Sequence, residues 1–103
     1  MKRVKLDQTK DLPAEGKGKV LLLQDGREIA IFKREGKLYA IDNICPHEGG
    51  PLGDGVFEED IVTCPWHGWQ FDVKTGACQN LCGENVCCYP VEVENGEIFL
   101  RLE

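Results

Sequence analysis

The chain has 103 residues, of which 42% are hydrophobic and 29% are charged, and its formal net charge is −6. These values predict one folded domain over residues 1–103 and exclude a disordered or collagen-like chain. The excess of acidic residues argues against nucleic acid or an anionic membrane surface as a partner.

The longest apolar run, Val20–Leu23, is far shorter than the ~20 residues that cross a bilayer. No basic segment followed by an apolar stretch opens the chain. We therefore expect no secretory signal, no membrane association and a cytoplasmic location. Six cysteines are unusual in such a chain. In the cytosol they favour metal binding or redox chemistry over structural disulfides.

Short runs with β-like alternation, separated by turn residues, occupy most of the chain. The pairs Asp25-Gly26, Glu35-Gly36 and Asn95-Gly96 predict tight turns, and the last is the strongest hairpin signal. No apolar pattern with helical spacing continues for about 11 residues. The sequence therefore predicts an all-β antiparallel domain, a small sandwich or a barrel-like stack. The predicted strands are Arg3–Leu6, Lys19–Leu23, Glu28–Lys33, Lys37–Asp42, Ile61–Cys64, Trp69–Val73, Val86–Glu94 and Glu97–Leu102.

Two breaks in the β pattern each carry one cysteine and one histidine. The first break spans residues 43–55 and contains Cys45-Pro46-His47, and the second is Cys64-Pro65-Trp66-His67-Gly68. Thiolate and imidazole ligands suit zinc or an iron–sulfur cluster. Two such loops that face each other can offer two cysteines to one metal and two histidines to a second. The prolines stiffen the turns, and the glycines allow backbone N–H groups to approach the sulfur atoms.

With sixteen residues between them, the two motifs resemble the Rieske 2Fe–2S signature. The resemblance implies one 2Fe–2S cluster, with Cys45 and Cys64 on one iron and His47 and His67 on the other. It covers roughly residues 18–103 and implies an antiparallel Rieske fold. That fold has a β-sandwich base and a small cluster-binding subdomain of two ligand loops, here roughly residues 43–85. Further matches are Leu38–Asn43, Gly50-Pro51-Leu52, Phe71-Asp72, Thr75-Gly76 and Tyr89-Pro90-Val91.

A zinc site with the same four ligands is the alternative, and it would make the chain a zinc-stabilised interaction module. Zinc fingers usually pair like ligands as Cys-x2-4-Cys and His-x3-5-His, which is unlike the spacing here.

The resemblance also bears on the reduction potential. Respiratory Rieske proteins carry an additional cysteine in each ligand loop, where this chain has Gly50 and Trp66. They also place hydroxyl donors toward the cluster, at positions that Trp69 and Phe71 occupy here. Because fewer donors stabilise the reduced cluster, we expect a potential nearer about −150 than +300 mV, the two ends of the Rieske range.

The residues themselves indicate electron transfer rather than catalysis. No further histidine remains for a mononuclear iron or a general base, and no G-x-G-x-x-G motif is present. The resemblance is to soluble Rieske ferredoxins that feed aromatic-ring dioxygenases, with His47 and His67 at the exposed tip. It implies a reductase as electron donor and a terminal oxygenase or reductase as acceptor. The small subunit of an assimilatory nitrite reductase is the alternative.

The acidic balance is consistent with docking on a basic patch of the partner, although it also serves solubility.

The signature leaves four cysteines unassigned: Cys78, Cys82, Cys87 and Cys88. We interpret them as small buried apolar residues. The alternatives are a disulfide of Cys78 with Cys87 or Cys88, a second metal site and a thiol-based redox sensor. Cys82 lies where the family has a Gly-Pro-rich loop over the cluster, and we expect it near the cluster. Trp69 is expected in the core, and Trp66 over the cluster or against a partner.

Overall fold

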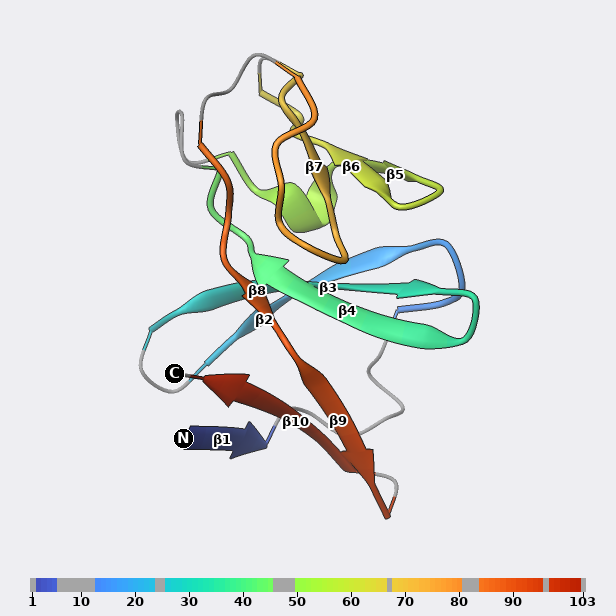
Figure 1. Ribbon diagram of the computed structural model, residues 1–103, viewed down its shortest axis with the longest axis vertical. Coiled ribbons are helices and arrows are strands. Elements are labelled where there is room, and N and C mark those ends of the chain that lie inside the picture. Colours follow the sequence, from blue (N-terminus) through green and yellow to red (C-terminus); the bar gives the residue numbers. More distant parts are fainter. Residues whose placement is uncertain are drawn as a thin grey trace.

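Figure 1 shows the computed structural model of the chain with its longest axis vertical. The structure describes residues 2–5, 13–23, 26–45, 50–66, 68–80, 84–95 and 97–102, without the side chains of Lys2 and Leu102. Within these ranges, ten strands form three antiparallel sheets, and one short 3-10 helix is present. The predicted all-β antiparallel class is confirmed. No helix in the described ranges is both long and apolar enough to cross a membrane.

The first sheet pairs the strands nearest the two ends of the chain. Its order is β1 (Lys2–Lys5), β10 (Glu97–Leu102) and β9 (Val91–Glu94). Glu94 pairs with Glu97 across the predicted turn, which confirms the hairpin. Arg3 of β1 reaches over β10 and binds two carboxylates of β9, at 3.2 Å from Glu92 and 2.8 Å from Glu94.

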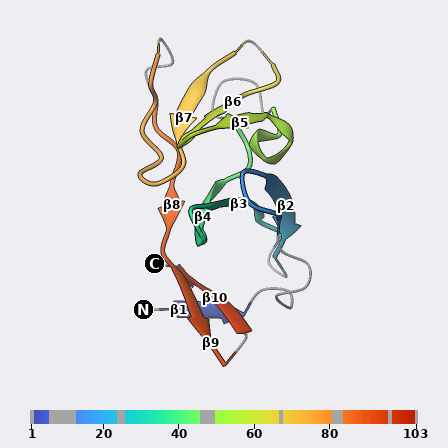
Figure 2. The ribbon, with the colours of Figure 1, turned by 90° about the vertical axis from the view of Figure 1, so that its right-hand side faces the viewer.

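The second sheet forms the middle layer of the molecule (Figures 1 and 2). Its order is β2 (Gly18–Leu22), β3 (Glu28–Arg34), β4 (Lys37–Asp42) and β8 (Cys88–Tyr89). The turn between β3 and β4 holds Glu35 and Gly36 at φ 53° and 76°. Two successive positive φ values match the twist of the paired strands, as the sequence predicted for this turn.

The third sheet is small and lies on the opposite side of the middle layer from the first sheet (Figure 2). Its order is β5 (Val56–Glu58), β6 (Ile61–Thr63) and β7 (Gln70–Asp72), and the 3-10 helix η2 (Leu52–Asp54) precedes it. The ligand loops predicted from the sequence leave β4 and join β6 to β7, so both belong to this end of the molecule.

The middle sheet is buried on both faces because successive side chains of a strand point to opposite sides. On β3, residues 29–32 are all fully buried. Alternate residues therefore contribute to two separate cores, and each fully buried Ile, Leu or Phe contributes roughly 1.5–3 kcal/mol. The core toward the first sheet includes Ile29, Ile31, Ala40, Ile98 and Leu100. The core toward the third sheet includes Ala30, Phe32, Ile41, Leu52, Val62 and Phe71.

Two elements differ from the sequence prediction. The predicted strand Val86–Glu94 is divided at Pro90, which has no N–H to donate to a sheet. Its first part, β8, pairs with β4 in the middle sheet, and its second part, β9, pairs with β10 in the first sheet. The strand β5 and the helix η2 were not predicted, because both lie in a Gly- and Asp-rich stretch that reads as a loop.

Candidate metal centre

The structure places the two predicted cysteine ligands in closed turns. Cys45 follows β4, and its N–H donates to the carbonyl of Gly50 at 3.0 Å. Cys64 follows β6, and its N–H donates to the carbonyl of Trp69 at 2.7 Å. Each bond closes a loop of only a few residues, so each cysteine is held at the base of its own turn.

The two thiols lie together in the core below the third sheet. Both residues are only 2% exposed, although nineteen positions separate them in the chain. Their side chains interact directly. Burial raises the pKa of the Cys64 thiol, the N–H of Trp66 opposes this shift by donating to the sulfur, and the neighbouring Cys45 thiol raises the pKa further.

Gly50 completes the wall around the sulfur atoms. A Cβ built on Gly50 would lie 2.7 Å from Cys64 Sγ and 3.1 Å from Cγ of Trp66. Separations this short do not occur between unstrained side chains, so a side chain here would displace the sulfur. The backbone of the first loop therefore packs directly against the cysteine of the second.

The other two predicted ligands, His47 and His67, lie outside the described residues, as does Cys82. Among the described residues, no group of three or more metal-ligating side chains comes together. Two buried thiols at the bases of two neighbouring loops nevertheless suit a soft or borderline metal, because a cation favours the ionised thiolate that burial disfavours. The donor set in this part of the chain thus fits an iron–sulfur cluster or zinc.

The aromatic residues near the second loop follow the sequence prediction in part. Trp69 packs against the core and Phe71 is fully buried, as expected. Trp66 is 48% exposed at the turn that carries Cys64. Ile44, beside Cys45, is 45% exposed, so apolar surface flanks both cysteine loops.

Sequence reasoning missed Asn80, which braces the second loop from the segment after β7. Its side-chain amide donates to the carbonyl of Gly68 at 3.1 Å, and its Oδ1 accepts the N–H of Gln70 at 3.2 Å. The backbone of Gln79 adds a bond to the carbonyl of Gln70 at 2.8 Å. Nothing in the local sequence marks these long-range contacts.

The structure corrects the interpretation of the remaining cysteines. Cys87 and Cys88 are exposed and free rather than buried: Cys88 lies on β8, a two-residue strand at the edge of the middle sheet, and Cys87 directly precedes it. Cys78 is in a disulfide bond, and since Cys87 and Cys88 are free, the suggested bridge to either of them is wrong.

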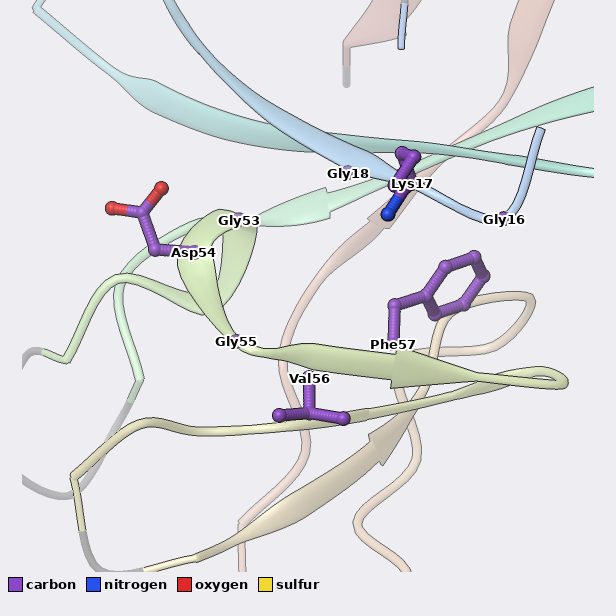
Figure 3. Close-up of a pocket in the computed structure, with 8 residues that line it drawn as sticks. All are labelled: Gly16, Lys17, Gly18, Gly53, Asp54, Gly55, Val56 and Phe57. Carbon is purple, nitrogen blue, oxygen red and sulfur yellow. The ribbon is translucent and has the colours of Figure 1, made fainter. Parts of the chain in front are cut away.

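A pocket of about 330 Å³ lies between the start of β2 and β5 (Figure 3). Residues 16–18 and 53–55, four of which are glycines, line it with Val56 and Phe57; Phe57 points toward Lys17 while Val56 points away. Neither Cys45 nor Cys64 lines it. The pocket is therefore separate from the thiol pair.

Comparison with known proteins identifies the family. A family model for the Rieske [2Fe-2S] domain matches residues 2–90. The ferredoxin component of the naphthalene 1,2-dioxygenase/salicylate 5-hydroxylase systems of Ralstonia sp is 40% identical over 81 residues, 77% of each chain. The solved ferredoxin of carbazole 1,9a-dioxygenase from Nocardioides aromaticivorans IC177 is 31% identical, with a TM-score of 0.87 over 100% of both chains. A structure described as an NADH-dependent nitrite reductase small subunit from Mycobacterium tuberculosis is 25% identical, with a TM-score of 0.83 over 98% of this chain and 96% of its own.

The structural likeness covers the whole chain, and it confirms the Rieske fold expected from the motifs. The family holds one 2Fe–2S cluster, which agrees with the buried thiol pair. This chain belongs to the Rieske [2Fe–2S] domain family.

Proposed function

We propose that this chain carries single electrons on one 2Fe–2S cluster, with Cys45 and Cys64 on one iron and His47 and His67 on the other. The observation that carries the proposal is the contact between two buried thiols from loops far apart in the sequence. When bound, the cluster supplies one-electron chemistry at a potential that its histidine ligands raise above that of all-cysteine clusters.

The residues around the thiols have roles of their own in this proposal. The core toward the third sheet, which includes both cysteines, keeps water from the sulfur atoms, and the N–H of Trp66 donates to Cys64. Hydrogen bonds to ligand sulfur tune both geometry and potential. We assign residues 43–85 as the cluster-binding subdomain within a single domain, 1–103. The relatives are named as ferredoxins or ferredoxin components, and this supports an electron-transfer component rather than an enzyme.

The partners we propose are a reductase that donates the electron and a terminal oxygenase that accepts it. The names of the relatives support this choice, because the proteins from Ralstonia and Nocardioides are ferredoxins of dioxygenase systems. A nitrite reductase small subunit shares the fold at lower identity, so that alternative is less favoured. We also propose a cytoplasmic location, which two exposed free thiols support.

The distribution of charge supports docking through the cluster-binding subdomain. Residues 43–85 contain seven acidic residues and one basic residue, so their net charge of −6 equals that of the whole chain. The remaining residues have a net charge of zero. A partner with a basic face would be steered toward the cluster end, where Trp66 and Ile44 offer apolar contact. The acidic residues are Glu48, Asp54, Glu58, Glu59, Asp60, Asp72 and Glu84, and the basic residue is Lys74.

Electron paramagnetic resonance of the reduced protein, with iron and sulfide analysis, tests the cofactor. We expect a brown protein with about two irons and two sulfides per chain and the low mean g value of a histidine-ligated cluster. The Cys45→Ser variant should lose the signal, whereas the matched Cys87→Ser variant, which removes an exposed free thiol, should keep it. A colourless protein with bound zinc would instead support the interaction module.

Reconstituted turnover tests the partners. With an NADH-dependent reductase and the oxygenase of a naphthalene-type system, the chain should support product formation in proportion to its concentration. A redox titration of the same sample should give a midpoint below about +100 mV, in the lower part of the Rieske range. Reduction of nitrite by a catalytic large subunit, without any oxygenase activity, would favour the alternative.

A further inference from the structure

Asn43 is a polar side chain in the core, only 1% exposed, at the junction between β4 and the first cysteine loop. Burying an amide is costly unless its polar atoms find hydrogen-bond partners. A buried asparagine two residues before a proposed cluster ligand therefore calls for a specific account.

Every hydrogen-bonding group of Asn43 is used. Its backbone N–H donates to the carbonyl of Glu28 at 3.1 Å, and its carbonyl accepts the N–H of Leu52 at 2.8 Å. Its side-chain Oδ1 accepts the N–H of Gly53 at 2.7 Å, and its Nδ2 donates to Oε1 of Glu28 at 2.9 Å. A backbone N–H can only donate and a carboxylate can only accept, so these partners fix which way the amide points.

These bonds close the first cysteine loop at its base. The loop leaves at Asn43 and returns at Leu52 and Gly53, and Asn43 binds both returning residues. Above this closure, Ile44 pairs with Pro51, and Cys45 donates to Gly50. The two sides of the loop are thus joined at three successive levels, of which Asn43 forms the lowest.

The approach of the two sides depends on Gly53. A Cβ on Gly53 would lie 2.5 Å from Cγ2 of Val20 and 3.1 Å from Oδ1 of Asn43. Glu28 lies on β3 in the middle sheet. The side-chain amide of Asn43 therefore connects Gly53, where the loop returns, to the most buried strand of the fold. The position of Cys45 relative to Cys64 therefore rests on a contact chain that runs from β3 through Asn43.

We propose that Asn43 is a positioning residue for the cluster: its amide, oriented by Glu28, sets the separation of the two sides of the first ligand loop and thereby the place of the Cys45 sulfur beside Cys64. This inference rests on the proposed ligand set, and its test uses cluster properties that need no redox partner.

The test compares the Asn43→Asp, Glu28→Gln and doubly substituted proteins in their cluster-loaded form. Asn43→Asp keeps the acceptor for Gly53 but turns a carboxylate oxygen toward Glu28, and two facing acceptors repel each other. At pH 8, iron release to a chelator should become about tenfold faster, since breaking one buried hydrogen bond to a charged group has an effect of this order. The EPR g values and the midpoint potential should shift with it.

Glu28→Gln should leave all three measurements near those of the parent protein, because the glutamine oxygen still accepts from Asn43. In the double variant the glutamine amide can donate to the introduced carboxylate, so iron release and the EPR spectrum should return toward the parent values. Asn95→Asp, the same change in the exposed turn between β9 and β10, is the matched control for charge. It should alter none of the three.

Glu28→Ala provides a second route if Asn43→Asp fails to fold, since it removes only the outer partner of the amide. It should shift the EPR spectrum in the same direction and by less. The inference is overturned if Asn43→Asp or Glu28→Ala loads a cluster whose iron release, g values and potential equal those of the parent. It is also overturned if the double variant shows no recovery. A parent protein with no Rieske signal would refute the proposed ligands instead.

Discussion

Single residues decide the geometry at the thiol pair, and Gly50 shows this directly. Its backbone accepts a hydrogen bond from Cys45 while its Cα faces the sulfur of Cys64. In this chain the absence of a side chain lets the two loops pack in contact.

We expect Gly50→Ala to reduce cluster occupancy and to shift the EPR spectrum. The added methyl group would meet Cys64 Sγ at 2.7 Å, and either the sulfur or the loop must move. Iron content per chain and the spectrum of the reduced protein measure the effect. Gly16→Ala is the control: its φ of +76° makes alanine strained, but nothing lies within 4 Å of the added atom. That variant should lose about 1 kcal/mol of stability without changing the spectrum. An unchanged spectrum in Gly50→Ala would contradict the packing argument.

The exposed thiols should react slowly with alkylating reagents at neutral pH. The charge of Asp42 is the largest cause of the raised pKa of Cys87, and burial is the largest cause for Cys88. Only the thiolate reacts, so alkylation should still accelerate above about pH 8.5, the ordinary thiol value. Asp42→Asn removes the negative charge, lowers the pKa of Cys87 and should speed its alkylation at pH 8.

Peptide mass spectrometry after timed alkylation separates the two sites. Cys88 serves as the internal control, since the charges that raise its pKa are those of Asp72 and Cys87 and not that of Asp42. A reaction at Cys87 that has already levelled off by pH 8 would contradict the raised pKa.

At this scale the sequence indicates candidate ligands more readily than the residues that support them. Cys45 and Cys64 stand out because each precedes a proline and a nearby histidine, a local pattern. Asn43 and Asn80 act through bonds to residues ten or more positions away, and an asparagine in a loop looks like any turn residue. Cys87 and Cys88 were misinterpreted because cysteine is usually buried, while the edge position of β8 depends on how distant strands pair.

At the scale of elements, one carboxylate joins the third sheet to the middle sheet. Asp60, in the turn between β5 and β6, binds Arg34 at the end of β3 at 2.8 Å and Lys74 after β7 at 3.4 Å. Its backbone carbonyl also accepts the N–H of Val73 at 2.9 Å. Lys74 lies 5.8 Å from the ring centroid of Tyr39 on β4. Three elements thus meet at one side chain.

Asp60→Asn should lower the free energy of unfolding by at most about 1 kcal/mol, since the three charged groups are partly exposed and screened by water. For a chain of this size the melting temperature would fall by about 4–8 °C per kcal/mol. Thermal unfolding at low and high salt measures this, and the difference between variant and parent should shrink as salt rises. Glu58→Gln, an exposed change on β5, is the control. An equal loss in both variants would show that the contact has no particular role.

Most of the strands could be predicted to within a residue or two because hydrophobic runs and turn pairs are local signals. Lys37–Asp42 and Glu97–Leu102 have the predicted bounds. In the small sheet only β5 was not predicted, since this three-residue strand gains its stability from pairing with β6 rather than from its own sequence. The division at Pro90 is visible only once the two partner sheets are known.

For the whole molecule, the net charge is concentrated in residues 43–85, the proposed cluster-binding subdomain. The acidic segment 43–85 carries the whole net charge, whereas the strands outside it balance their charges in ion pairs such as those of Arg3. The residues outside this segment have no net charge and therefore attract a charged partner only weakly. Such a partner should approach from the cluster end.

We expect the rate of reduction by the reductase to fall as salt rises from about 50 to 500 mM, since ions screen long-range attraction over about 10 Å or less. Glu58→Lys should slow the reaction several-fold at low salt. Glu35→Lys makes the same change of charge in the turn between β3 and β4, in the part of the chain that is neutral in sum, and should have a smaller effect. Stopped-flow kinetics gives both rates. Equal slowing by the two variants would mean that net charge, and not its location, matters.

The middle sheet, buried on both faces, has a consequence for how the protein comes apart. Ile29 and Ile31 belong to one core and Ala30 and Phe32 to the other, so a single strand supplies both. Neither core can unfold while the other stays folded, because the loss of β3 removes buried side chains from both. Amide protons of β3 should therefore exchange with solvent only when the entire chain unfolds, at the full free energy of unfolding.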